Sequence, residues 1–161
     1  MFAGTLLLAG CQVDPYYDAY TRKKPNNPDI VGTYILTGQT LNDQSVSNLR
    51  TKAGVTASPQ TLVIRSDGTF VATNIPQWSE GVPGDWSIKN FKSGSGKWKL
   101  DGGGGVDSRW GLDFSSSNIK LPNIDGMGTC LLGEKPPYQI LLNLARDPDQ
   151  DEAMTFEKQN P

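Results

Sequence analysis

Short runs in which apolar and polar residues alternate are the feature that most limits how this chain can fold. Residues 61–65 alternate in this way, the pair Asp67-Gly68 is typical of a tight hairpin turn, and residues 69–72 resume the alternation. Because one face of each run is apolar and the other polar, the runs predict antiparallel strands with one buried face. Further strand-like runs lie at residues 30–36, 97–100, 109–114, 138–144 and 152–157.

The connections between these runs are rich in turn-forming residues. Residues 101–105 are mostly glycine, and residues 147–151 combine Asp with Pro. Helical periodicity is weak and confined to residues 44–52. Many short strands separated by turn signals are typical of a barrel or sandwich, so we expect one all-β domain over residues 30–161.

Composition narrows the functional classes. The chain has 161 residues and a net charge of −2, and it contains no Lys/Arg-rich run, so a nucleic-acid partner is not expected. It has no histidine, which removes the commonest general base and the commonest metal ligand. We therefore expect no cofactor and no metal ion.

The first eleven residues suggest where the protein resides. The stretch Leu7-Leu8-Ala9-Gly10-Cys11 resembles a bacterial lipobox, in which small residues precede the cleavage site and the cysteine carries the lipid. Residues 1–10 are accordingly interpreted as a lipoprotein signal peptide and Cys11 as the lipidation site. The first four residues lack Lys and Arg, which leaves open a start upstream of Met1. The alternative is an ordinary apolar N-terminus with an incidental cysteine.

Residues 11–29 are predicted to be a lipidated N-terminus followed by a flexible tether, since prolines and polar residues dominate residues 12–29. The apolar run is far shorter than the roughly 20 residues of a spanning helix, so the lipid is the expected membrane contact. We expect the protein in the cell envelope. Because Gln12 and not Asp follows the cysteine, the outer membrane is expected in a Gram-negative host, and otherwise the outer face of the cell membrane.

The order of motifs resembles the lipocalin-like (calycin-type) domains of bacterial lipoproteins. The resemblance rests on Gly32-Thr33-Tyr34, on the hairpin at residues 62–70, on Gly84-Asp85-Trp86, and on the strand at residues 96–100. It implies a small antiparallel up-and-down β-barrel of about eight strands. The interior of such a barrel either holds a small apolar ligand or is filled by side chains.

Aromatic residues provide the candidate ligand contacts. Residues 75–91 lack clean alternation and are rich in Gly, Pro and aromatic residues, which favours a lid over the barrel mouth. Trp78, Trp86 and Phe91 are its candidate ligand-binding residues, and core packing is the alternative. Trp98 and Trp110 lie on the apolar faces of strands and are predicted to be core.

Other chemistry has weak support. The acidic run at residues 147–152 lacks the Gly and the distant Glu of a calcium loop, so a solvated loop is favoured. Cys130 is interpreted as a small buried hydrophobe. We expect a non-catalytic protein that binds a small apolar ligand or an envelope partner. The alternatives are a solid barrel that acts only through protein–protein surface contacts, and a carboxylate-based hydrolase.

Overall fold

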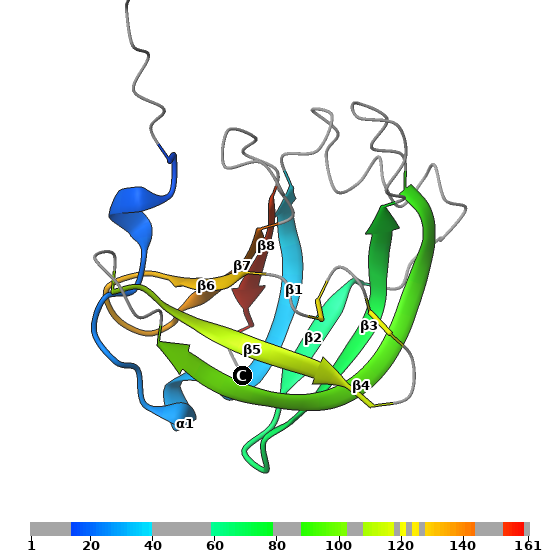
Figure 1. Cartoon of the computed structure of the whole chain (residues 1–161), viewed down its shortest axis with the longest axis horizontal. Helices are drawn as coiled ribbons and strands as arrows, with labels where there is room; N and C mark the ends of the chain where they lie inside the picture. The colour runs from blue at the N-terminus through cyan, green and yellow to red at the C-terminus, as the bar shows by residue number, and fades with distance from the viewer. Residues whose placement is uncertain are drawn as a thin grey trace, which may run out of the picture.

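The computed structural model describes residues 14–39, 59–78, 88–102, 108–117, 120–121, 124–125, 128–143 and 153–159. In this part, eight antiparallel strands form one sheet that curls into a nearly closed barrel (Figure 1). The strands are β1 (Gly32–Gln39), β2 (Thr61–Ile64), β3 (Thr69–Trp78), β4 (Ile88–Gly102), β5 (Trp110–Ser116), β6 (Thr129–Leu132), β7 (Gln139–Asn143) and β8 (Ala153–Lys158). The expected all-β barrel of about eight strands is confirmed.

The strand order is β5-β4-β3-β2-β1-β8-β7-β6. β1 pairs with β2 on one side and with β8 on the other, so the first and last strands of the barrel lie together. The sheet therefore ends at β5 and β6, which face each other across the remaining seam. The seam is narrow at Gly111, where an added Cβ would collide with the Thr129 carbonyl oxygen.

The β2–β3 hairpin forms as the alternation predicts. Leu62 and Ile64 are buried, and Gly68 adopts the positive φ of 80° that the turn requires. The Asp67 carboxylate accepts hydrogen bonds from the Thr69 amide (2.9 Å) and hydroxyl (2.6 Å), which lowers the pKa of this carboxyl group. These contacts hold the turn in place and give Asp67 a structural role.

The two described ends of the segment at residues 75–91, which was predicted to be irregular, are strand. Ile75–Trp78 belongs to β3, and Ile88–Phe91 belongs to β4, where Pro76 pairs with Phe91. A bulge between Ala72 and Ile75, with Asn74 at a φ of 53°, reverses which residues face inward. The reversal breaks the two-residue period, so the pattern did not reveal the upper halves of these strands.

Two further elements differ from the expectation. β6 shows no alternation because Cys130, Leu131 and Leu132, which point alternately to the two faces of the sheet, are all buried. The pattern therefore missed this strand. Ile30 was placed at the start of the first strand, but it ends the short helix α1 (Asn27–Ile30), whose second residue is a proline.

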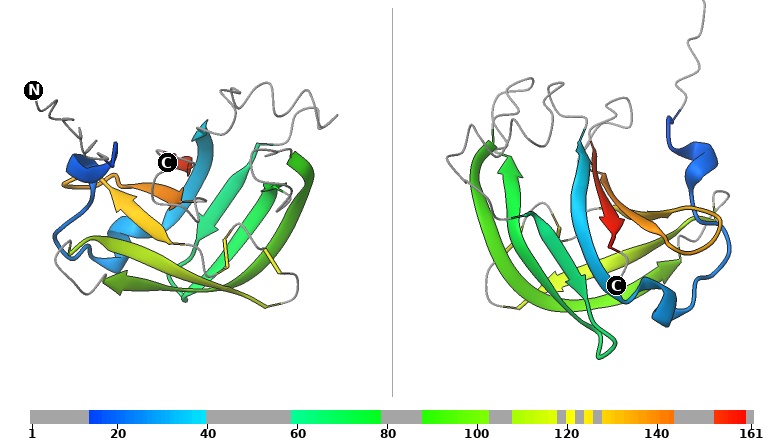
Figure 2. Two further views of the ribbon diagram at one scale, coloured as in Figure 1. Left: turned by 45° about the horizontal axis from the view of Figure 1, so that its top comes forward. Right: turned by 180° about the vertical axis from the view of Figure 1, so that it is seen from behind.

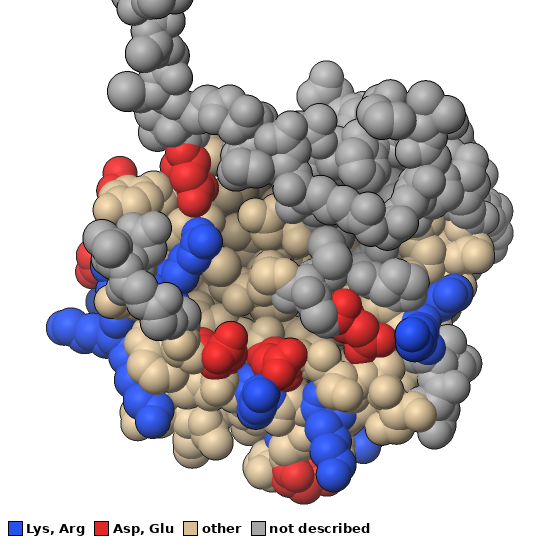
Figure 3. Space-filling view, viewed as in Figure 1, with Lys and Arg blue, Asp and Glu red and all other residues tan. Residues whose placement is uncertain are grey.

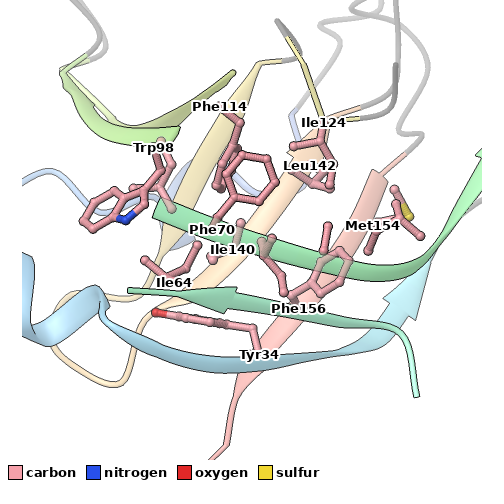
Figure 4. Packing of buried hydrophobic residues seen from close by; sticks show 14 of the residues in the cluster. Tyr34, Ile64, Phe70, Trp98, Phe114, Ile124, Ile140, Leu142, Met154 and Phe156 are labelled. Carbon is pink, nitrogen blue, oxygen red and sulfur yellow. The ribbon is translucent and has the colours of Figure 1, made fainter. Parts of the chain in front are cut away.

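Side chains from all eight strands fill the barrel. The main cluster includes Tyr34, Phe70, Trp98, Phe114 and Phe156, and the rings of Phe70 and Phe114 meet edge to face with centroids 5.0 Å apart (Figure 4). Gly96 has a packing role here, because a Cβ would collide with the Ser115 carbonyl and the Phe70 ring. The predicted core position of Trp98 is confirmed.

The described part of the predicted tether packs against the barrel. It contains the 3₁₀ turn η1 (Tyr17–Ala19) and runs along the β6–β7 hairpin to α1 in both views of Figure 2. Tyr20 is buried with Cys130, Leu132, Leu141 and Ala153 in a second cluster on the outer face of the sheet. Composition predicted a flexible tether, because it counts residue types and does not show their contacts. In the structure, Tyr20 and Thr21 of this segment have partners on the sheet.

The described surface mixes both signs of charge. Figure 3 shows acidic and basic side chains interspersed on the visible face, and Lys99 and Asp113 form an exposed ion pair at 3.0 Å. Opposite charges next to each other give this surface little net field. Within the described ranges, none of the helices has the length and apolar character needed to cross a bilayer.

Candidate functional site

Four connections belong to the same end of the barrel, because β1, β3, β5 and β7 run in one direction and β2, β4, β6 and β8 run in the other. Long connections on a rigid scaffold are where binding residues concentrate. The opposite end is joined by shorter or tighter links, such as the turn at residues 65–68. We name the first end the mouth. Its connections are residues 40–60, 79–87, 117–128 and 144–152.

A buried amide lies on the inner face of β3 near the mouth. Gln77 is 5% exposed, and it is two residues beyond Ile75, which belongs to the barrel core. Its Nε2 donates to the carbonyls of Ile75 (3.0 Å) and Pro76 (3.1 Å). Its Oε1 is buried and has no hydrogen-bond partner among the described residues. A buried acceptor without a partner costs free energy, so this oxygen is suited to a donor that is supplied from outside the chain.

A second buried glutamine borders the same end. Gln60 directly precedes β2 and is 1% exposed, and its backbone carbonyl accepts a hydrogen bond from the Leu36 amide at 3.0 Å. The mouth therefore carries two buried carboxamide side chains, Gln60 just before β2 and Gln77 on the adjacent strand β3. An amide side chain is neutral and both donates and accepts hydrogen bonds, so this end fits an uncharged polar group better than an ion.

The β5–β6 connection sends two apolar side chains into the barrel. Leu121 and Ile124 are fully buried in the main cluster, and Figure 4 shows Ile124 beside Leu142. The Asp125 carboxylate fixes this connection by accepting hydrogen bonds from the amides of Ser116 (2.7 Å) and Leu121 (2.9 Å). We name Leu121 and Ile124 the plug.

Sequence reasoning missed the plug, although a signal was present. The connection at residues 117–128 contains the apolar residues Ile119, Leu121, Ile124 and Met127 among Ser, Asn, Lys and Asp, and Leu and Ile are residue types that are often fully buried. The expectation placed the cover of the barrel in residues 75–91 instead. The described ends of that segment are paired strand, and residues 79–87 lie outside the described residues.

Of the three predicted ligand-binding residues, only Phe91 has a described side chain. Trp86 lies outside the described residues, and Trp78 ends β3 with a side chain that is not described. Phe91 is half-buried and pairs with Pro76, the neighbour of the core residue Ile75. Successive residues of a strand face opposite sides, so Phe91 lies on the face away from the core.

The other predicted residues have mixed outcomes. Cys11 and the acidic run at residues 147–152 lie outside the described residues. Trp110, expected in the core, is only half-buried, and the Lys24 ammonium lies 5.6 Å from its ring centroid. Cys130 is a buried free thiol, and burial raises its pKa, which agrees with its interpretation as a small hydrophobe.

A metal site and known relatives are two further sources of functional information. In the described ranges, no group of three or more His, Cys, Asp or Glu residues is placed to hold a metal ion. No family model, curated protein or solved structure matches the chain. The arrangement of the mouth, with a buried acceptor on β3 and an apolar plug, is therefore the observation from which function is argued.

Proposed function

We propose that this is a lipid-anchored envelope protein that binds a small, mainly apolar molecule at the mouth of its barrel and performs no catalysis. The observation that carries the proposal is the buried Gln77 Oε1, which has no hydrogen-bond partner within the described part of the chain. A ligand with one hydroxyl or N–H group would satisfy this oxygen, while its apolar part replaces the plug residues Leu121 and Ile124. The lipocalin-like resemblance supports the same kind of ligand.

Binding is tested with a matched pair of probes, 1-decanol and its methyl ether, which differ in the hydroxyl donor. Tryptophan fluorescence should report tighter binding of the alcohol by about fivefold, the value of one hydrogen bond of about 1 kcal/mol. Gln77→Leu should remove this preference because the acceptor is lost. Gln139→Leu is the control, since Gln139 contacts Glu157 on the exposed side of the barrel.

The outcomes separate the alternatives. Equal binding of both probes by the wild type and Gln77→Leu would refute the role of Gln77. If neither probe binds, the alternative of a solid barrel acting through surface contacts is favoured, because the described interior is already filled. Trp78 and Trp86 remain proposed contacts, and replacing both by Ala should weaken probe binding while the unfolding midpoint stays near that of the wild type.

The anchor is tested separately. The Leu8-Ala9-Gly10-Cys11 pattern supports lipidation at Cys11, and two or more acyl chains would hold the protein stably on a membrane. Cells expressing the gene from its native start should incorporate labelled palmitate into the wild type and not into Cys11→Ala. Cys130→Ala serves as the control for the second cysteine. Equal labelling of wild type and Cys11→Ala would refute the anchor.

A further inference from the structure

The N-terminal segment is built into the seam of the barrel. The Thr21 amide donates to the Leu131 carbonyl of β6, and the Trp110 amide of β5 donates to the Thr21 carbonyl, both at 2.9 Å. Tyr20 forms an isolated antiparallel bridge with Leu132. The Thr21 hydroxyl also donates to the Gly133 carbonyl at 2.7 Å. Residues 20 and 21 therefore join β5 to β6 where the two strands do not pair directly.

This connection also fixes Asp14, the first described residue. The Tyr20 hydroxyl donates to the Asp14 carboxylate at 2.8 Å, and the Arg109 guanidinium lies 3.7 Å from the same carboxylate. The Tyr17 amide donates to the Asp14 carbonyl at 3.1 Å. Two residues separate Asp14 from Cys11 in the sequence, so Asp14 is the described residue nearest in the chain to the proposed anchor.

The surface around this point combines aromatic rings with cations. Tyr17 is 47% exposed, the largest exposure among the large apolar side chains of the described residues, and the Arg22 guanidinium lies 4.7 Å from its ring centroid. The Arg109 guanidinium lies 4.9 Å from the Tyr20 ring centroid. Lys23 and Lys24 are exposed next to Arg22 in the chain. We name Tyr17, Arg22, Lys23, Lys24 and Arg109 the N-terminal face.

The N-terminal face has the chemistry of a membrane-contacting surface. Tyrosine rings are enriched at membrane interfaces, and basic side chains are attracted to anionic headgroups. Three acidic residues, Asp14, Asp18 and Asp29, lie in the same segment, against the four basic residues of the N-terminal face; the Asp14 carboxylate accepts a hydrogen bond from Tyr20 and pairs with Arg109. Figure 3 shows Lys and Arg side chains together with Asp and Glu side chains along the margin that carries this segment in Figure 1.

We propose that the N-terminal face rests on the anionic phospholipid headgroups of the membrane that carries the anchor, so that the barrel is held in one orientation. This inference rests on the proposed lipidation of Cys11. In this arrangement the barrel does not rotate freely on a long tether, because its β5–β6 side is held against the membrane.

The test uses the full chain carrying Cys130→Ala, produced without lipid and coupled through the Cys11 thiol to a maleimide lipid in vesicles. Phosphatidylcholine vesicles with and without phosphatidylglycerol are compared, and lysine acetylation is measured by mass spectrometry. Lys23 and Lys24 should react several-fold more slowly on vesicles containing phosphatidylglycerol. Lys97 and Lys99, on the outer face of β4, should react at the rate of the uncoupled protein.

A charge variant provides the second measurement. Each basic residue contributes about fivefold to partition onto an anionic surface, so the triple variant Arg22→Gln, Lys23→Gln, Lys24→Gln should lose most of the binding of uncoupled protein to these vesicles. The double variant Lys97→Gln, Lys99→Gln is the matched control and should keep it. Equal acetylation of all four lysines on the coupled vesicles, or equal loss in both variants, overturns the orientation.

Because the anchor is supplied chemically, this experiment does not depend on lipidation in the cell. If palmitate labelling in cells fails but Lys23 and Lys24 are protected from acetylation on the vesicles, the proposed anchor is refuted. The affinity of the N-terminal face for lipid then stands. Successful labelling with unprotected Lys23 and Lys24 would refute the orientation alone.

Discussion

At the scale of single residues, a few buried polar contacts attach the N-terminal segment to the barrel. The Tyr34 hydroxyl is buried and donates to the Ile30 carbonyl of α1 at 2.6 Å. The Lys158 ammonium donates to the Asp29 carbonyl at 2.7 Å from the last strand. These two bonds hold α1 against β1 and β8, which sets where the preceding chain enters the seam.

The contact of Tyr34 gives a prediction for stability and its pH dependence. Tyr34→Phe should lower the free energy of unfolding by about 1–2 kcal/mol at neutral pH, because the buried Ile30 carbonyl loses its donor. Burial raises the pKa of Tyr34 above its ordinary value of 10.0. Its contribution is therefore complete below pH 10 and is lost as the pH rises towards the pKa of the folded state.

Urea denaturation at several pH values checks this prediction. The difference between the wild type and Tyr34→Phe should narrow above pH 10, because only the wild type has this proton to lose on unfolding. Tyr17→Phe is the control, since Tyr17 is exposed, and it should leave stability at neutral pH unchanged. A difference that stays constant from pH 7 to strongly alkaline pH would contradict the assigned cause.

At the scale of elements, the seam between β5 and β6 depends on a glycine. A Cβ on Gly111 would collide with the Thr129 carbonyl oxygen and lie 3.5 Å from the Cys130 Cα. Because the collision is with backbone, it cannot be relieved by a side-chain rotation. β5 and β6 can approach at this level only because Gly111 has no side chain.

Gly111→Ala is therefore expected to be strongly destabilising. It should lower the free energy of unfolding by about 2 kcal/mol or more, since overpacking in a tight contact forces the backbone to move. Gly128→Ala, just before β6, is the matched control because a Cβ there meets no atom within 4 Å. Thermal unfolding of both variants measures the effect. Similar melting temperatures for the two variants would show that the strands separate at little cost.

At the scale of the whole molecule, the barrel has apolar clusters on both sides of its sheet. The main cluster fills the interior, and the second lies between the N-terminal segment and the outer face of β6, β7 and β8. In β7 the inward residues Ile140 and Leu142 and the outward residue Leu141 are all buried. The N-terminal segment is therefore part of the folded domain, which fixes the side of the barrel that faces its proposed anchor.

The sequence by itself determined the features that depend on neighbours in the chain. The alternation at residues 61–65 and 109–114, with the Asp67-Gly68 turn, identified strands, a hairpin and the all-β class, because side-chain period and turn chemistry are local properties. The same pattern placed Trp98 in the core. These predictions hold because one face of each of these strands is buried and the other is exposed.

Only the tertiary structure decided the features that depend on distant contacts. β6 is buried on both faces, β3 changes its inward face at a bulge, and Thr21 finds hydrogen-bond partners more than 80 residues away on β5 and β6. The burial of Gln77, whose Oε1 has no partner among the described residues, and the burial of Leu121 and Ile124 are likewise products of barrel closure. A local period cannot report such contacts, because burial is set by whichever segment folds over each residue.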